Sequence, residues 1–136
     1  MKNIFLIFII ICFSCNRKIE FVQSKVTSNL FLIKNPPKND SLLRKEIILF
    51  LIKNPVEYNK SPYHVNFYKY TWNTKYFINN LPDPGGFSSE ELDNYPQDNI
   101  GSFIISKCEN DTTKLVGELI LAKNPFKADT IIYKCD

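Results

Sequence analysis

VNFYKYT, residues Val65–Thr71, is rich in the aromatic and β-branched side chains that favour strands. A second aromatic segment, Lys75–Ile78 (KYFI), follows it after Asn73 and Thr74, two residues suited to a tight turn. The two segments together predict a β-hairpin. Further along the chain, two more segments of this kind are separated by a polar turn. They predict a second hairpin, which is formed by Ser102–Cys108 and Lys114–Leu121.

A fifth strand is expected at Thr130–Cys135, and a helix is expected upstream of the hairpins. Asp40 or Ser41 can cap this helix, which would run to about residue 53, before Pro55. Six consecutive apolar residues, Ile47–Ile52, leave a buried strand as the competing interpretation. The sequence therefore predicts an α+β fold, in which an N-terminal helix packs on an antiparallel β-meander of about five strands.

One heptapeptide, LFLIKNP, occurs at Leu30–Pro36 and again, unchanged, at Leu49–Pro55. A looser copy, LILAKNP, spans Leu119–Pro125. Successive separations of 19 and 70 residues do not form the regular period of a solenoid. Each copy is interpreted as an apolar element that ends at the same stop signal.

The first residues have the form of an export signal. Lys2 supplies a positive charge, Ile4–Phe13 is a run of ten apolar residues, and the small Ser14 follows. Ten apolar residues suit the hydrophobic region of a secretory signal, whereas a membrane-spanning helix needs about 20. We therefore expect the protein to be exported from the cytoplasm.

The tetrad CFSC, Cys12–Cys15, resembles a lipobox, the cleavage site of lipoprotein signal peptidase. Ser14 fits, and Cys12 stands where leucine is usual, as in the relaxed lipoboxes of Bacteroidota. The resemblance implies a small bacterial lipoprotein whose Cys15 carries diacylglycerol and an amide-linked fatty acyl chain such as palmitate. More than one acyl chain gives stable membrane anchoring.

The resemblance implies a signal peptide at residues 1–14 and a lipidated cysteine at position 15. The polar, weakly patterned residues that follow predict a tether, so that 15–30 is lipidated cysteine and tether, and the chain length leaves one small domain at 31–136. The membrane would be the first partner, through the lipid on Cys15. Arg17 and Lys18 stand in place of the acidic stretch that is associated with surface export in Bacteroidota. The periplasmic face of the outer membrane is therefore the favoured location within the cell envelope.

Two cysteines, Cys108 and Cys135, remain beyond the signal and the anchor. An even pair in an exported domain predicts a disulfide, with two reduced thiols as the alternative. Closing this loop would stabilise the fold by roughly 3–4 kcal/mol on the chain-entropy model. Cys108 and Cys135 do not form a Cys-x-x-Cys motif, and the chain has a single histidine, His64, so the sequence of the domain predicts no metal site and no cofactor.

Charge is unevenly distributed along a nearly neutral chain, which gives no sign of a nucleic-acid partner. Residues 16–79 hold 11 Lys and Arg against 4 acids, whereas residues 80–136 hold 5 against 10. A basic half beside the anchor could lie against anionic lipid headgroups. A mixed, solvated surface after folding is the alternative.

Candidate binding residues are an aromatic side chain and an acidic loop. Trp72 would lie at the tip of the first hairpin, where it could anchor a protein partner or stack on a sugar. The loop from residue 81 to residue 99 carries Glu90, Glu91 and Asp93 and has no basic residue. Calcium ligation would require a different spacing of these acids and a glycine for the sharp turn.

No catalytic motif is present, so the leading hypothesis is a non-enzymatic, lipid-anchored envelope protein that acts by binding. In one concrete version it resembles the small lipoproteins that neutralise antibacterial toxins in the periplasm, with the acidic loop meeting a basic toxin. A structural or assembly accessory of an envelope complex is the alternative. A hydrolase that uses carboxylates ranks below both.

Overall fold

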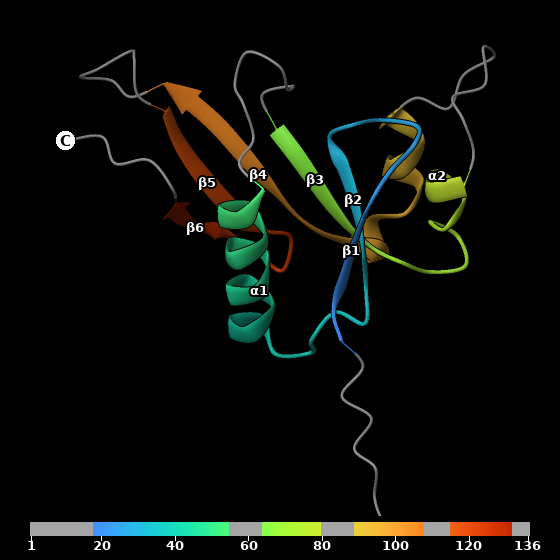
Figure 1. The fold of residues 1–136 in the computed structure, drawn as a ribbon, viewed down its shortest axis with the longest axis horizontal. Helices are drawn as coiled ribbons and strands as arrows, with labels where there is room; N and C mark the ends of the chain where they lie inside the picture. Colours follow the sequence, from blue (N-terminus) through green and yellow to red (C-terminus); the bar gives the residue numbers. More distant parts are fainter. Residues whose placement is uncertain (1–17, 55–63, 80–88, 108–114, 132–136) are drawn as a thin grey trace, which may run out of the picture.

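A computed structural model describes residues 18–54, 64–79, 89–107 and 115–131, and these include a six-stranded sheet (Figure 1). Its strands are β1 (Glu20–Gln23), β2 (Leu30–Lys34), β3 (His64–Lys69), β4 (Asn99–Lys107), β5 (Leu115–Leu121) and β6 (Asn124–Ile131). The helical elements are α1 (Asp40–Lys53), α2 (Tyr76–Asn79) and the 3₁₀ segments η1 (Ser89–Asn94) and η2 (Pro96–Asp98). The strands lie side by side in chain order, with β1 and β6 at the edges.

The sheet is mixed, and this corrects the predicted fold class. β2 and β3 are parallel, while the other four neighbouring pairs are antiparallel. Two parallel neighbours need a crossover connection, and α1 lies in it. The prediction of an N-terminal helix that packs on an antiparallel meander of about five strands is therefore wrong. Two strands precede the 14-residue α1, and the sheet dominates the described part of the chain.

The helix expected near residues 40–53 is confirmed as α1. The cap differs from expectation, because the Asn39 side chain accepts a hydrogen bond of 3.0 Å from the Leu42 N–H. The buried residues of α1 recur at every fourth position and are Leu43, Ile47 and Leu51. This spacing places them on one side of the helix, toward the sheet.

The larger core lies between α1 and one face of the sheet. At its β1 end, Phe50 of α1 stacks on Phe21 of β1, with ring centroids 4.2 Å apart, and lies edge-on to Phe31 and Phe67. Such aromatic pairs add about 0.5–1.5 kcal/mol each beyond the burial of their area. Phe21 belongs to the segment 15–30 that was expected to be a tether; here residues 20–23 form a strand paired with β2.

A smaller core lies on the opposite face of β2 and β3, where α2 and η1 pack. It contains Leu30 and Leu32 of β2 together with Tyr68, Phe77 and Leu92. In Figure 1, α1 and α2 lie on opposite sides of these two strands. The predicted strand at Lys75–Ile78 is wrong: Tyr76–Asn79 form α2, and Phe77 is buried in this core.

Strand β4 contains a bulge opposite the end of β3. Phe67 pairs with Gly101 and Tyr68 with Asn99, so Ile100 is the extra residue. The bulge shifts the alternation of β4 and brings Ile100 into the larger core together with Phe103. Gly101 has φ +153°, and a Cβ on it would collide with the backbone oxygen of Ile120 and lie 2.9 Å from Leu121 Cα.

The second predicted hairpin is confirmed, because β4 and β5 are antiparallel and pair from Gly101–Leu121 to Lys107–Leu115. The last strand starts at Asn124, six residues before the expected Thr130. The expected pair Cys108–Cys135, the lipidation site Cys15 and the signal segment lie outside the described residues. None of the described helices has the length and apolar character needed to cross a membrane.

Candidate functional site

An ordered turn follows β3 and carries Trp72; we call residues 71–75 the Trp72 turn. Thr71 and Thr74 close it, because the Thr71 N–H donates to Thr74 Oγ1 (2.9 Å) and the Thr74 N–H donates to Thr71 Oγ1 (3.3 Å). The Thr74 hydroxyl also donates to the Lys69 carbonyl (2.5 Å), and the Lys75 N–H donates to the Thr71 carbonyl (3.0 Å). Small hydroxyl side chains stabilise turns in this way because they replace backbone partners.

The turn is also fixed to the rest of the fold. Thr74 is fully buried, and Thr71 Oγ1 donates a 2.9 Å hydrogen bond to Asp98 Oδ2 at the end of η2. Asp98 is 7% exposed, so this acid supports the turn and is not part of an open acidic surface. The next element, α2, is held by Phe77, whose carbonyl accepts from the Ser24 hydroxyl at 2.7 Å.

Trp72 itself projects into solvent, with 81% of its surface exposed. The Lys75 ammonium lies 2.9 Å from the centroid of its ring, a cation–π contact that limits the freedom of the indole. Two tyrosines of the same region, Tyr70 and Tyr76, are also partly exposed. Tyr68, by contrast, is buried in the smaller core.

The acidic residues expected to bind a partner lie on η1. Asp93 is exposed, while Leu92 beside it is buried and attaches η1 to the smaller core. Burial, and to a lesser extent the negative charge of Asp93, raises the pKa of the Tyr68 phenol. Glu90 and Glu91 belong to the same 3₁₀ segment, but their side chains are outside the described set. η1 thus packs on the same small core as α2, the element that follows the Trp72 turn.

A second feature was not predicted: a cleft of about 520 Å³ beyond the carboxyl ends of the parallel strands β2 and β3. We call it the lysine cleft, because Lys38, Lys69 and Lys123 line it together with Pro37, Asp40 and Gln97. These residues come from four separate chain segments. No local motif predicts such a cleft, because its walls are brought together by the parallel pairing of β2 with β3 and the antiparallel pairings of β3, β4 and β5.

Residues that could bind a metal ion do not gather in the described part of the chain. His64 is exposed at the start of β3. Within residues 18–54, 64–79, 89–107 and 115–131, no group of three or more His, Cys, Asp and Glu side chains is arranged to hold a metal ion.

Comparison with models of protein families, with curated protein sequences and with solved structures finds no match to this chain.

Proposed function

We propose that this protein is a lipid-anchored component of the bacterial cell envelope that acts by binding a partner protein, with Trp72 at the centre of the contact. The observation that carries the proposal is the exposed Trp72 side chain on a turn closed by internal hydrogen bonds. The lipid anchor on Cys15 belongs to the same proposal and is supported by the lipobox-like tetrad.

An ordered, exposed tryptophan is suited to this role for energetic reasons. Tryptophan is enriched among the residues that dominate binding energy, and truncation of such a residue costs about 2 kcal/mol or more. A side chain held in place before binding loses less conformational freedom when the complex forms. The three hydrogen bonds within the Trp72 turn, with the bonds from Thr74 to the Lys69 carbonyl and from Thr71 to Asp98, order the backbone that carries the indole.

Asp93 adds a preference for the charge of the partner. Its exposed carboxylate lies on η1, which packs on the same small core as α2, the element that follows the Trp72 turn, and a basic partner surface would meet complementary charge there. This is the surface that a cationic toxin would contact if the protein serves as an immunity-type inhibitor. In an envelope assembly, the same surface would instead hold a stable component of the complex.

The proposal is tested by capture of partners from the native host. Full-length protein, its Trp72→Ala variant and its Phe126→Ala variant would be expressed at equal levels and purified from detergent-solubilised envelope. Phe126 is the matched control, because it is an aromatic residue on β6 that is 99% exposed. We expect a discrete partner with the unsubstituted protein and with Phe126→Ala, and loss of about 30-fold in affinity with Trp72→Ala. Equal capture by all three proteins would refute the proposal.

The same variants separate the two kinds of partner. If the partner is a toxin, cells that express the unsubstituted protein or Phe126→Ala survive exposure to it, and cells with Trp72→Ala do not. If the partner is a constitutive envelope protein and no protection is seen, the assembly role is supported. A toxin gene beside the gene for this protein would favour the immunity role.

A further inference from the structure

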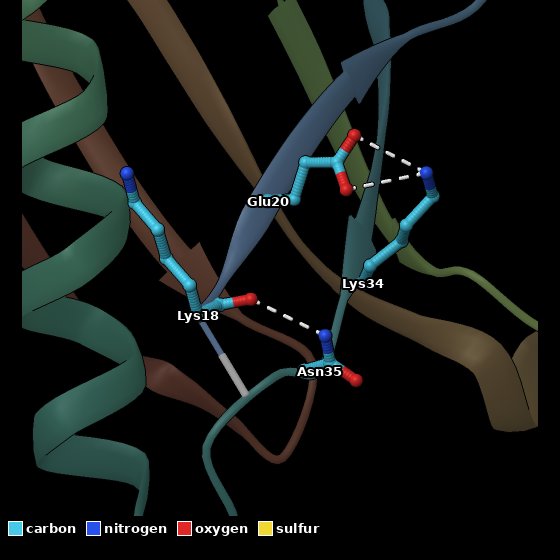
Figure 2. A network of polar contacts seen from close by, with 4 residues as sticks. All are labelled: Lys18, Glu20, Lys34 and Asn35. Atoms are coloured by element: carbon cyan, nitrogen blue, oxygen red, sulfur yellow. Dashed lines mark hydrogen bonds and ion pairs between the residues drawn. The ribbon is translucent and has the colours of Figure 1, made fainter. Parts of the chain in front are cut away.

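The first described residue of the chain is fixed to the end of the domain that carries the lysine cleft. Asn35 Nδ2 donates a 3.2 Å hydrogen bond to the Lys18 carbonyl, and Asn35 itself has φ 52°, a left-handed conformation that asparagine tolerates. Next to it, Lys34 and Glu20 form an ion pair of 3.2 Å between β2 and β1. Figure 2 shows this network, with the Lys18 side chain extending away from Glu20.

The point where β1 begins lies close to Lys38. Ile19, Asn35 and Lys38 line one recess, and Lys38 with Pro37 also lines the lysine cleft. Lys18 and the lysine cleft therefore belong to the same end of the domain, which we call the basic end.

The connection from this end to the proposed anchor is very short. Cys15 precedes Lys18 by three residues, and three residues span at most about 10 Å. A tether through residue 30 would have allowed the domain to move about 50 Å from the membrane. Because the sheet begins at Glu20, lipid on Cys15 would instead hold the basic end at the headgroup layer.

The charge of the lysine cleft suits an anion. Three lysines against one aspartate leave a formal excess of two positive charges. Asp40 pairs with Lys123 at 3.2 Å, and Lys69 donates to the Gln97 carbonyl at 3.4 Å, which places both ammonium groups at the cleft wall. The N-terminus of α1 adds the positive end of a helix dipole beside Lys38.

We propose that the basic end rests on the anchoring membrane and that the lysine cleft receives the phosphate of an anionic phospholipid headgroup. A volume of about 520 Å³ lies within the range of small-molecule sites, and each lysine near an anionic leaflet adds to the attraction. This inference rests on the lipid anchor of the proposed function and adds the orientation of the domain and the class of ligand.

The test uses lipidated full-length protein reconstituted in vesicles of phosphatidylcholine, with or without phosphatidylglycerol. Hydrogen exchange would be measured at the amides of residues 38–41 and 122–124. The test variant is Lys38→Gln/Lys123→Gln. The control is Lys25→Gln/Lys53→Gln, which removes the same charge from two exposed lysines that do not line the cleft.

We expect phosphatidylglycerol to slow exchange at these amides in the unsubstituted protein and in the control, and to slow it about tenfold less in the test variant. Soluble glycerophosphate added to phosphatidylcholine vesicles should not reproduce the effect. Equal exchange in both vesicles, equal protection of the test variant, or full protection by glycerophosphate would each overturn the proposal.

The mass of the reconstituted protein separates this result from the anchor itself. An acylated chain without protection contradicts the headgroup proposal alone and leaves the anchored binding function standing. A chain without acyl groups contradicts the anchor and removes the basis for this orientation.

Discussion

The hydroxyl of Thr71 donates a 2.9 Å hydrogen bond to the carboxylate of Asp98, which joins the Trp72 turn to the end of η2. Both elements flank β3, and Asp98 is almost fully buried. Asp98 thus supports the fold, whereas Asp93, Asn94 and Gln97 of the same predicted loop are exposed. This buried contact helps to fix the backbone of the turn that carries the exposed Trp72.

Replacing Asp98 by alanine should therefore loosen the turn. The Thr71 hydroxyl loses its charged acceptor, and we expect a loss of about 1–3 kcal/mol in the free energy of unfolding and faster hydrogen exchange at residues 71–75. Asp98→Asn keeps an acceptor oxygen and should cost less. Asp93→Ala serves as the control, because Asp93 is exposed. If Asp98→Ala unfolds at the same denaturant concentration as Asp93→Ala, the contact does not support the turn.

Gly101 is expected to tolerate no side chain. A Cβ at this position would collide with the Ile120 backbone, and its φ of +153° is rarely adopted by other residues. Gly101→Ala should lower the free energy of unfolding by about 2 kcal/mol or more. The neighbouring Ser102→Ala, at a half-buried position, should change it much less. Denaturant titration of the two variants checks this. Similar midpoints would show that the backbone accommodates the added Cβ beside Ile120 with little loss of stability.

Arg44 of α1 and Asp129 of β6 form an ion pair that connects the helix to the last strand. Their side chains are 12% and 26% exposed, so solvent screens the pair less than a surface pair. A double-mutant cycle with Arg44→Ala and Asp129→Ala should give a coupling free energy of about 1–2 kcal/mol. A coupling close to zero would mean that the two charges act independently.

The raised pKa of Tyr68 predicts a loss of stability at alkaline pH. Its phenol has a pKa raised above the usual value near 10 by burial first and by the charge of Asp93 second. The unfolded chain therefore loses this proton at lower pH than the folded chain, so this contribution to stability is complete below pH 10 and declines as pH rises toward the folded pKa. Tyr68→Phe should show less loss of stability above pH 10. An identical alkaline decline in both proteins would contradict this.

Asp93→Asn offers a second measurement on the same phenol. Removing the negative charge should lower the pKa of Tyr68, yet leave it above the usual value, because burial is the larger cause. The pKa of Tyr68 in both proteins would be measured by NMR titration of the tyrosine resonances. A pKa that is unchanged by Asp93→Asn would show that η1 does not hold Asp93 near β3.

The local sequence pattern predicted the secondary structure of several elements. It failed where the pairing of strands in the folded protein decides which secondary structure a segment adopts. The α1 segment has its own cap and stop signals, and β4 and β5 are neighbours in sequence, so both were predictable. Lys75–Ile78 has strand-forming side chains, but both edges of β3 are already paired, with β2 and with β4. With no free edge beside β3, this segment closes as helical turns and buries Phe77.

The repeated heptapeptide shows the same limit directly. LFLIKNP forms β2 at Leu30–Lys34, whereas its identical copy forms the last turns of α1, through Lys53. In β2 the alternate residues reach two cores, while in α1 Leu51 continues the four-residue spacing of the buried face. Identical side chains therefore take the secondary structure that their neighbours can bury.

The candidate site was predictable in part. Trp72 was expected on a turn and is exposed on one, although the turn leads into a helix rather than a hairpin strand. Asp98 lay in the expected acidic loop, but its burial depends on Thr71, 27 positions away. The lysine cleft could not be predicted, because its lysines meet only when β2 pairs with β3 in parallel and β3, β4 and β5 pair in order.

The anchor is tested most directly by the intact mass and N-terminal sequence of the protein purified from its native host. The account predicts a chain that begins at Cys15 and carries diacylglycerol and a further acyl chain on that residue. A chain that keeps residues 1–14 and bears no fatty acyl group would contradict it, and both the envelope location and the membrane-facing basic end would have to be abandoned.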